Sequence, residues 1–420
     1  MTQKMRLIIA LILIYFTYGM LLNTVGTVIL RAIASLDVSK AQAGWFDGFK
    51  DISIAAVSFI TASYLPRFGL KRAMQAGLIL SAIACIMLRL VPGYIAICLH
   101  YMLIGISFAV VKVGLYAMIG LATDDSKAHA SLTSIVEGGF MVGVLSVTLL
   151  FSLFVGNTLV DTSHDWLNTY WVLAAMCVVS LLMLSSVVVD EQAARPDAAQ
   201  ASIIDMLKLA RLPLVLVFIC CAFIYVFIEQ GIGTWLPTFN NEVLGLPQSM
   251  SVVAGSFYAG AIAAGRILSG AAMRKLGWYP VVMCCLGIVI ATILLIGPLS
   301  HRSVHSPILD WAHAPLAAYL FLGIGFFLAP IYPTIVSVLL SASPKSRHTE
   351  LMGLVVIFSA LGGTAGSRLT AVLFASVSGA TAFASMVFPA AMLMVGLYLL
   401  RHRQLAADSI NRSEVSSVRF

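Results

Sequence analysis

Long apolar runs, separated by short polar segments, recur along the whole chain. A helix of roughly 20 residues crosses the ~30 Å hydrocarbon core of a bilayer, and lipid offers the backbone no hydrogen-bond partners, so runs of this length predict membrane helices. A β-barrel is excluded because its alternating ten-residue pattern is absent. Twelve helices are predicted, over Arg6–Arg31, Gly44–Tyr64, Ala73–Leu90, Tyr94–Ala122, Ser131–Val155, Tyr170–Val189, Leu214–Leu236, Met250–Met273, Pro280–Leu299, Ala314–Leu340, Leu351–Val377 and Thr381–Leu400.

Eight charged side chains interrupt these apolar runs, and they all fall on predicted helices 2, 4, 5, 7, 8 and 11. A charge at bilayer depth costs at least about 3 kcal/mol, so it normally faces a partner or a water-filled path. Four of the eight are acidic and four are basic, so they are able to neutralise one another. They are Asp47, Lys50, Asp51, Lys112, Glu137, Glu229, Arg266 and Arg368.

The charge balance fits a membrane protein better than a nucleic-acid partner. The chain is 60% hydrophobic and 10% charged, with a formal net charge of +7. Seventeen of the 25 lysines and arginines fall in segments that are cytoplasmic if both termini are cytoplasmic, and four fall on the other side. This asymmetry is the positive-inside signature. It predicts a multi-pass protein of the cell inner membrane with both termini in the cytoplasm.

The predicted helices repeat in two halves. Helix 1 begins at Arg6 and helix 7 at Leu214, an offset of 208 residues. Two six-helix halves in parallel repeat are a known transporter plan, with the substrate site near the bilayer midplane between them. The expected organisation is an N-terminal bundle (1–189), a cytoplasmic linker with a short amphipathic helix (190–212), a C-terminal bundle (213–403) and a cytoplasmic tail (404–420). The fold class is an all-α membrane protein with twelve transmembrane helices in two pseudo-symmetric bundles.

Two short loops carry a family resemblance. The segment Ala62-Ser63-Tyr64-Leu65-Pro66-Arg67-Phe68-Gly69 follows helix 2, and Gly270-Ala271-Ala272-Met273-Arg274-Lys275-Leu276-Gly277 follows helix 8. Both resemble the Gly-x-x-x-Asp-Arg-x-Gly-Arg-Arg loop of the major facilitator superfamily, although Pro66 and Arg274 stand in place of the aspartate. The resemblance implies that helices 1, 4, 7 and 10 line a cavity, that 2, 5, 8 and 11 complete its walls, and that 3, 6, 9 and 12 face lipid. The embedded charges avoid helices 3, 6, 9 and 12.

Within that superfamily the chain resembles the fucose–galactose–glucose:proton symporter family, in particular its TsgA-like branch. The stretches that carry this resemblance are Glu229–Pro237, Ala329–Ile335 and the dipeptide Tyr170-Trp171. Sugar permeases of that family carry acidic residues on helices 1 and 4. Here helix 1 offers Asn23 and Thr24 and helix 4 offers Lys112, so their mechanism does not transfer.

Some of the charged residues lie at similar predicted depths in the bilayer and are therefore candidates for ion pairs. Asp47 and Asp51 share a face of helix 2, with Lys50 one turn from Asp47. Lys112 and Glu137 lie at similar depth in the N-terminal half, where a static salt bridge is one interpretation. Arg266 and Lys50 are equally consistent with structural roles.

Glu229 is the strongest candidate for a proton carrier, since a carboxylate in a low-dielectric site binds a proton more readily. A permanent pair with Arg368, at matched depth in the same half, is the alternative. Gly231 and Gly233 follow Glu229 and loosen helix 7, and Pro237 removes a backbone donor at its end. A second glycine-rich stretch, Gly362–Gly366, is interpreted as a helix-packing segment.

The predicted function is secondary active transport of a small hydrophilic solute, a sugar, an organic acid or a zwitterion, by proton-coupled symport. Three cavity cations, Lys112, Arg266 and Arg368, tilt this expectation toward carboxylate substrates. The alternatives are a proton-driven exporter of a polar metabolite or drug, and a non-transporting membrane receptor. The residues expected to bind substrate or ion are Asn23, Lys50, Asp51, Lys112, Tyr116, Glu137, Glu229, Gln230, Arg266 and Arg368.

Other chemistry has no support in the sequence. It holds no phosphate-binding Gly-x-x-x-x-Gly-Lys motif and no His/Cys metal constellation, and all seven cysteines fall within predicted spans. We therefore expect no enzyme activity, no catalytic residue, no cofactor and no metal. The expected partners are the substrate, a proton or sodium ion, and the lipid bilayer around a monomer.

Overall fold

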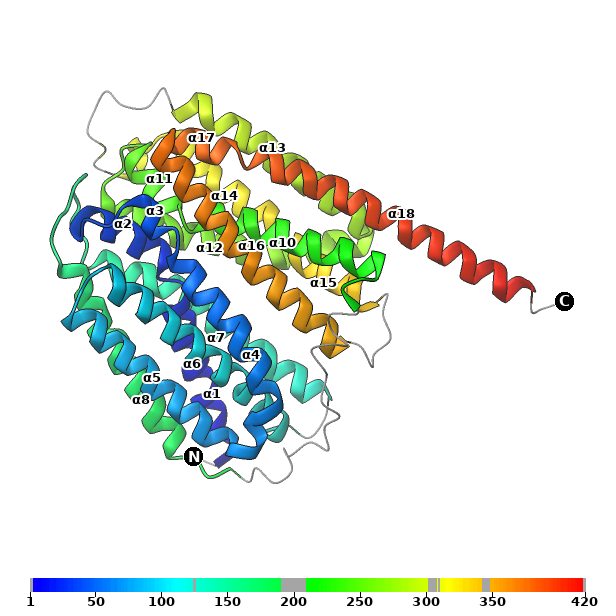
Figure 1. Ribbon diagram of the computed structural model, residues 1–420, viewed down its shortest axis with the longest axis horizontal. Coiled ribbons are helices and arrows are strands. Elements are labelled where there is room, and N and C mark those ends of the chain that lie inside the picture. Colours follow the sequence, from blue (N-terminus) through cyan, green and yellow to red (C-terminus); the bar gives the residue numbers. More distant parts are fainter. Residues whose placement is uncertain are drawn as a thin grey trace.

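The computed structural model describes residues 3–123, 126–189, 209–300, 308, 310–341 and 348–417. Regular secondary structure within these residues is entirely helical. Figure 1 shows two groups of helices lying side by side, with the first half of the chain in blue to green and the second in green to red. The all-helical fold expected from the apolar runs is confirmed.

The N-terminal half contains the elements up to the linker. They are α1 (Gln3–Leu22), α2 (Val25–Ser35), α3 (Lys40–Ala43), α4 (Phe46–Phe68), α5 (Leu70–Leu90), α6 (Tyr94–Leu121), α7 (Ser126–Ser152), the 3-10 helix η1 (Asp165–Asn168) and α8 (Thr169–Ser185).

The C-terminal half follows the same order of long helices. Its elements are α10 (Pro213–Gly233), α11 (Leu236–Glu242), α12 (Gln248–Leu276), α13 (Trp278–Ser300), the 3-10 helix η3 (Trp311–His313), α14 (Leu316–Leu328), α15 (Ile331–Ser341), α16 (His348–Ser376), α17 (Gly379–Ala384) and α18 (Val387–Ser417).

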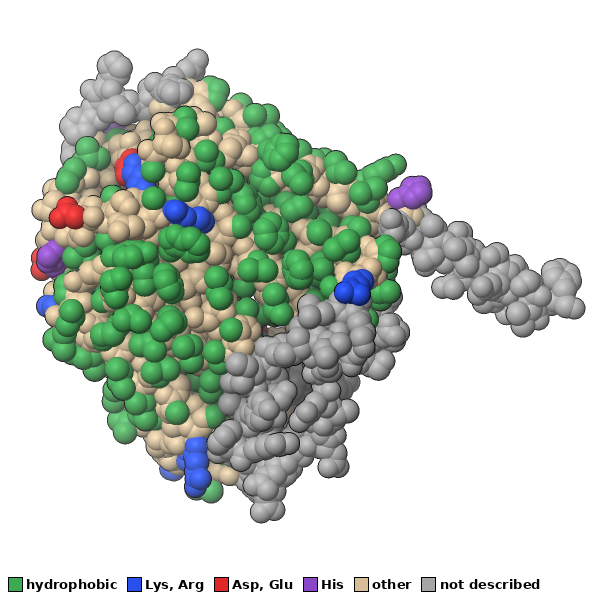
Figure 2. All heavy atoms as spheres, viewed as in Figure 1, with side chains coloured by type: hydrophobic (Ala, Val, Ile, Leu, Met, Phe, Trp, Pro, Cys, Tyr) green, Lys and Arg blue, Asp and Glu red, His purple; other side chains and the backbone are tan. Residues whose placement is uncertain are grey.

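Eleven spans in the described residues are long and apolar enough to cross a membrane. The twelfth predicted span corresponds to α4, whose first two turns carry Asp47, Lys50 and Asp51. It nevertheless packs between α6 and α16 as a full-length helix of 23 residues. Figure 2 shows hydrophobic side chains covering most of the visible face. Such a surface fits a protein surrounded by lipid.

Most of the linker, residues 190–208, lies outside the described residues, and with it most of the predicted amphipathic helix. The segment predicted as a cytoplasmic tail, from residue 404 on, begins within α18. Helix α18 continues without interruption to Ser417, and Figure 1 shows it extending beyond the bundle.

Glycines bring α1 against α7 and, equivalently, α10 against α16. A Cβ added at Gly19 or Gly143 would lie 2.2 Å from the carbonyl oxygen of Phe140 or Phe16. In the second half, a Cβ at Gly362 or Gly366 would lie 2.3 or 2.1 Å from the carbonyl oxygens of Phe223 and Phe227. These contacts leave no room for any larger residue. The packing role predicted for the segment 362–366 is therefore confirmed, and the N-terminal half uses the same kind of contact between its own helices.

The two halves meet at one end of the bundle, which we call the closed end. It contains the start of α4 and α12 and the last turns of α7 and α16. Near this end Gly48 faces Thr364 of α16, and the hydroxyls of Thr148 and Ser256 bond between α7 and α12. The tightest contact is at Gly44, where an added Cβ would lie 2.4 Å from the Cβ of Ala371.

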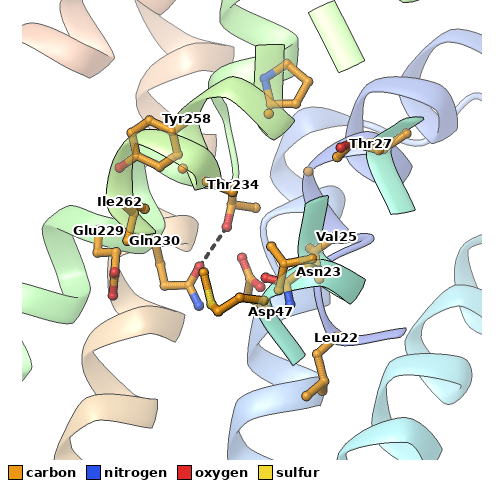
Figure 3. A pocket seen from close by; sticks show the side chains of 18 of the residues that line it. Leu22, Asn23, Val25, Thr27, Asp47, Glu229, Gln230, Thr234, Tyr258 and Ile262 are labelled. Carbon is orange, nitrogen blue, oxygen red and sulfur yellow. Dashed lines mark hydrogen bonds between the residues drawn. The ribbon is translucent and has the colours of Figure 1, made fainter. Parts of the chain in front are cut away.

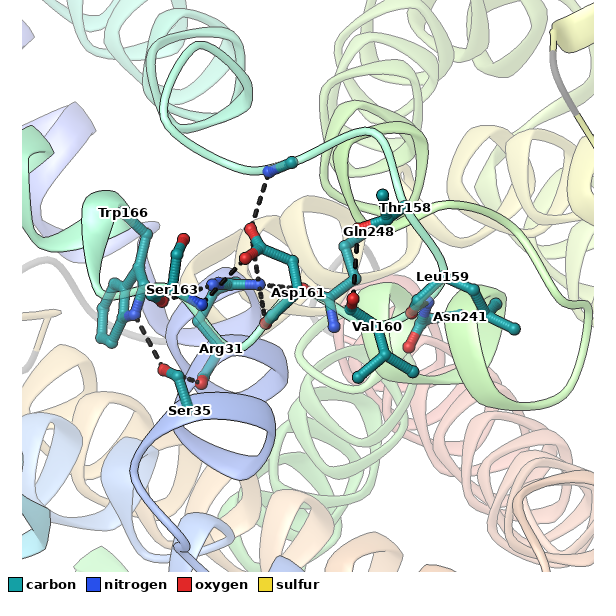
Figure 4. A network of polar contacts seen from close by, with 11 residues as sticks. Arg31, Ser35, Thr158, Leu159, Val160, Asp161, Ser163, Trp166, Asn241 and Gln248 are labelled. Atoms are coloured by element: carbon teal, nitrogen blue, oxygen red, sulfur yellow. Dashed lines mark hydrogen bonds and ion pairs between the residues drawn. The ribbon is translucent and has the colours of Figure 1, made fainter.

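A buried arginine ties the closed end across both halves. Arg31 of α2 is fully buried, and Figure 4 shows its guanidinium at the centre of a polar network. It donates to the carbonyl oxygens of Asp161 (2.6 Å) and Ser163 (2.8 Å), forms a 3.2 Å salt bridge with the Asp161 carboxylate, and bonds to the side chain of Gln248 in α12. We call this network the Arg31 latch.

The loop after α7 extends the latch onto the C-terminal half. Its Thr158 carbonyl accepts from the Gln248 amide at 2.9 Å, and its Leu159 carbonyl accepts from the Asn241 side chain at 3.0 Å. Backbone groups of this loop thus find partners on the opposite half only while the closed end stays shut.

We predict that Gly44→Ala opens the closed end. Gly44 has an ordinary helical backbone (φ −61°), so alanine introduces no backbone strain, but its methyl group collides with Ala371 across the interface. The expected result is greater labelling of a cysteine placed at Thr364. Gly120→Ala is the matched control, since nothing lies within 4 Å of a Cβ at that position. Equal labelling in both variants would show that this contact does not hold the halves together.

A second prediction concerns the pH dependence of the latch. Burial disfavours the charge on Asp161, but hydrogen bonds from the Gly156 and Ser163 amides and the charge of Arg31 outweigh it and lower the pKa of this carboxyl. A lowered pKa gives stability that is complete above the ordinary value, about 3.9, and is lost as the pH falls through the lowered one. Asp161→Asn should therefore reduce the melting temperature at pH 7 and have less effect near pH 3. An equal difference at both pH values would contradict a contribution from the charge.

Candidate substrate site between the two halves

A cavity of about 290 Å³ lies between the halves, next to the breaks in their first long helices. Figure 3 shows polar side chains entering it from both halves. Its lining residues are Leu22, Asn23, Val25, Gly26, Thr27, Asp47, Lys50, Phe140, Met141, Val144 and Thr148 from the N-terminal half, and Glu229, Gln230, Gly233, Thr234, Pro237, Gly255, Tyr258, Ala259, Ile262 and Arg266 from the C-terminal half.

The helix breaks follow from local sequence. The α1–α2 span is interrupted at Asn23 and Thr24, whose side chains bond back to the carbonyl oxygens of Gly19 (2.9 Å) and Leu21 (3.1 Å). Such side chains compete with the helical backbone for partners. The α10–α11 span is interrupted after Gly233, and Pro237 lies in the first turn of α11, as predicted for this segment. Both breaks leave polar groups at the cavity.

The N-terminal wall holds a cluster of three charges on α4. Lys50 Nζ lies 2.8 Å from Asp47 Oδ1 and 3.6 Å from Asp51 Oδ1, which confirms that the charges expected to cluster on helix 2 do so. The side chains of Asp47, Lys50 and Asp51 are 0%, 8% and 13% exposed. With both aspartates ionised, two carboxylates share one ammonium group. This wall then carries one net negative charge.

The C-terminal wall pairs Glu229 with Arg266. Glu229 Oε1 accepts a 3.0 Å hydrogen bond from the hydroxyl of Tyr225, which lies one turn earlier in α10. Arg266 of α12 interacts electrostatically with Glu229 without forming a salt bridge within 4.0 Å. Their opposite charges balance at the cavity.

Half of the ten residues predicted for the site line this cavity. They are Asn23, Lys50, Glu229, Gln230 and Arg266. Asp51 adjoins it through Lys50. The remaining four, Lys112, Tyr116, Glu137 and Arg368, are described by the structure but do not line it.

Three of those four form a separate cluster with Tyr15 in the N-terminal half. Glu137 accepts hydrogen bonds from the hydroxyls of Tyr116 and Tyr15, the latter at 3.3 Å. Lys112 lies over the ring of Phe108, with Nζ 5.5 Å from its centroid, and interacts with Glu137 only at longer range. The direct Lys112–Glu137 salt bridge is not formed in this conformation, and both tyrosine hydroxyls bond to Glu137 Oε1.

Arg368 lies at the closed end instead of beside Glu229. Its guanidinium donates to the carbonyl oxygen of Ala41 and stacks over Trp45, 5.2 Å from the ring centroid. Both partners belong to the N-terminal half, so Arg368 joins the two halves and forms no ion pair with Glu229 in this conformation. The expectation of three cavity cations is therefore corrected. Arg266 and the already paired Lys50 are the basic residues that line the cavity.

The sequence analysis did not assign two residues of the cavity wall, Asp47 and Tyr258, to the site. Asp47 is recognisable from its spacing to Lys50, but its place on the wall depends on how α4 packs. Tyr258 lies in an apolar stretch of α12 with no charged neighbour in sequence, and only the three-dimensional structure brings it beside Glu229.

Two helical halves around a shared polar cavity are the architecture of a multi-pass membrane transporter. A family model described as Major Facilitator Superfamily matches residues 7–367. The chain belongs to the Major Facilitator Superfamily.

Relatives and solved structures agree with this family. The chain is 24% identical over 368 residues to an uncharacterized MFS-type transporter, YceJ, of Bacillus subtilis (strain 168), covering 84% of this chain and 85% of the relative. It is similar in fold to a bacterial homolog of the human lysosomal transporter Spinster in an inward-facing, occupied conformation (TM-score 0.74, 14% identity, 94% and 96% of the two chains covered).

Two further solved structures share the fold at 14% identity. They are the nucleoside transporter NupG, with a TM-score of 0.71 and 95% and 99% of the chains covered, and a D-xylose–proton symporter, with a TM-score of 0.71 and 95% and 97% covered.

We predict that Lys50→Met destabilises the protein by about 3–5 kcal/mol, the usual cost of removing one partner from a buried ion pair. Two buried carboxylates are then left without their cation. The measurement is thermal or denaturant unfolding in detergent. Adding Asp47→Asn to the same variant should restore part of the loss, since it removes one of the two uncompensated charges. A Lys50→Met protein as stable as the wild type would mean that the aspartates are not both ionised.

Proposed function

We propose that this transporter moves a small hydrophilic solute, a sugar or an organic acid, by alternating access with proton symport. The observation that carries the proposal is the cavity itself. It draws charged and polar side chains from both halves, and the contacts that join the halves beside it include hydrogen bonds and ion pairs. A solute bound there touches both halves, so its binding energy can favour one arrangement of them over another.

The distribution of basic residues supports an orientation. Lysine and arginine cluster in the segments at the end opposite the Arg31 latch, including Arg67, Lys71, Arg274 and Lys275. By the positive-inside rule this end faces the cytoplasm. In this orientation the latch lies on the external side.

Glu229 is the proposed proton carrier. It lies four residues before the end of α10, beside the flexible break and within electrostatic reach of Arg266. When Glu229 is ionised it balances Arg266, and when it is protonated Arg266 becomes available to other partners. A proton on this carboxylate therefore changes the charge that a solute meets in the cavity.

The fold relatives and the sequence resemblance are compatible with proton symport. One solved relative is a D-xylose–proton symporter, and the stretch Glu229–Pro237 resembles the fucose–galactose–glucose:proton symporter family. These likenesses support a hydrophilic solute and a proton as the coupling ion.

We predict that Glu229→Gln abolishes accumulation driven by a pH gradient and leaves solute exchange at least partly intact. Glutamine keeps the size and hydrogen bonding of a protonated glutamate but cannot release a proton. The assay is uptake and counterflow in proteoliposomes, with and without an imposed gradient, against a panel of sugars and organic acids. Asp310→Asn, on an exposed loop, is the matched acid-to-amide control.

Gradient-driven accumulation that persists in Glu229→Gln would place the proton site elsewhere, with Asp51 and Glu137 as the next carboxylates to test. Accumulation of solute on the opposite side of the membrane would instead favour an exporter.

A further inference from the structure

Two buried polar atoms on the cavity wall lack hydrogen-bond partners. They are the Oδ2 oxygen of Asp47, in a residue that is 0% exposed, and the hydroxyl of Tyr258, in a residue that is 6% exposed. Asp47 belongs to the N-terminal half and Tyr258 to the C-terminal half. Buried polar groups in native proteins are nearly always paired, so each unpaired group requires an explanation.

The Asp47 carboxylate is only half satisfied. Its Oδ1 oxygen is bound by Lys50, and the second interaction of Lys50 goes to Asp51 rather than to Oδ2. An ionised carboxylate accepts hydrogen bonds and donates none. Oδ2 can therefore be satisfied only by an O–H or N–H group supplied from outside the cluster.

Tyr258 stands on the opposite wall at the break of α10. Its ring packs against Gly233 and Gly325, where an added Cβ would lie 3.3 and 2.9 Å from ring atoms, so the ring has little freedom to move. The hydroxyl interacts electrostatically with Glu229 but forms no hydrogen bond with it. A phenolic hydroxyl both donates and accepts.

Two neighbouring side chains already make hydrogen bonds. Asn23 donates to the carbonyl oxygen of Gly19, and Thr234 donates to the Gln230 side chain at 3.0 Å. In the view of Figure 3, Asp47 and Tyr258 lie on opposite sides of this Gln230–Thr234 pair. The residues that carry the unpaired acceptor and the unpaired hydroxyl thus belong to opposite walls of one cavity.

We propose that Asp47 Oδ2 and the Tyr258 hydroxyl form the substrate-recognition pair, and that the substrate presents an O–H or N–H donor to Asp47. The inference rests on the proposed transport function and narrows its substrate class to hydroxyl- or amine-bearing solutes. A carboxylate is acceptor-only at neutral pH, so it cannot satisfy Oδ2. With both aspartates ionised, the net negative charge of the Asp47–Lys50–Asp51 cluster also repels it. While Glu229 is ionised, it balances Arg266, the cation that would otherwise offset this repulsion.

The test is ligand binding to the purified full-length protein in detergent. Binding is measured as an increase in the melting temperature. Three panels distinguish the chemistry: neutral hexoses and nucleosides, primary amines, and mono- and dicarboxylates. We expect a hydroxyl or amine compound to bind. Its affinity should fall about tenfold or more in Asp47→Asn and roughly fivefold in Tyr258→Phe, the usual effects of losing a charged and a neutral hydrogen bond. A larger loss in Asp47→Asn for an amine than for a hydroxyl compound identifies the amine as the ligand type.

Tyr170→Phe is the matched control, because Tyr170 is a buried tyrosine packed against Trp166 and His100 and does not line the cavity. Tyr258→Phe keeps the test decisive if Asp47→Asn does not fold. Three results would overturn the proposal. They are binding confined to carboxylates, an unchanged affinity in both cavity variants, and no binding by any hydroxyl or amine compound. Because the assay uses no pH gradient, a failure of proton coupling would leave its result unchanged.

Discussion

The hydrocarbon core of a membrane supplies neither water nor hydrogen-bond partners, and this constraint decides where every charged or irregular feature of the chain lies. A charge or an interrupted helix is stable at bilayer depth only when other protein groups or a water-filled cavity surround it. The chain meets the constraint by collecting these features between its two halves. Asp47, Lys50, Glu229 and Arg266 all line the same cavity, next to the breaks at Asn23 and Thr234.

The contacts between the halves include polar ones that have no counterpart in the glycine packing inside each half. Inside a half, glycines press one helix against the backbone of another, as at Gly19 on Phe140 and Gly362 on Phe223. Between the halves, the Arg31 latch and the Arg368–Ala41 bond add polar contacts to the glycine contact of Gly44 with Ala371. Water can replace polar partners when the halves separate, whereas it cannot replace close backbone packing. This difference allows each bundle to move as a rigid unit under the proposed alternating access.

The two halves repeat in shape but not in charge. Equivalent glycine contacts and equivalent helix breaks occur in both, yet the N-terminal wall carries the cluster around Lys50 and the C-terminal wall carries a balanced Glu229 and Arg266. Two different walls give a bound solute a defined orientation. They also place the proposed proton carrier and the proposed substrate acceptor on opposite halves, so that both halves respond when the cavity is filled.

The sequence alone determined the helical class, the repeat, the clustering of Asp47, Lys50 and Asp51, and the weak point of α10 after Glu229. These features depend on residues close together in the chain, on hydropathy over about 20 residues, and on glycine and proline, whose effects are local. The tertiary structure decided which charges share a cavity. Arg368 lies at the same predicted depth as Glu229, but the packing of α16 against α4 turns it toward Ala41 and Trp45. Tyr258 reaches the cavity through the packing of α12, which no local pattern encodes. Depth along a helix can be read from the chain, whereas the direction in which a side chain points depends on neighbours that are distant in sequence.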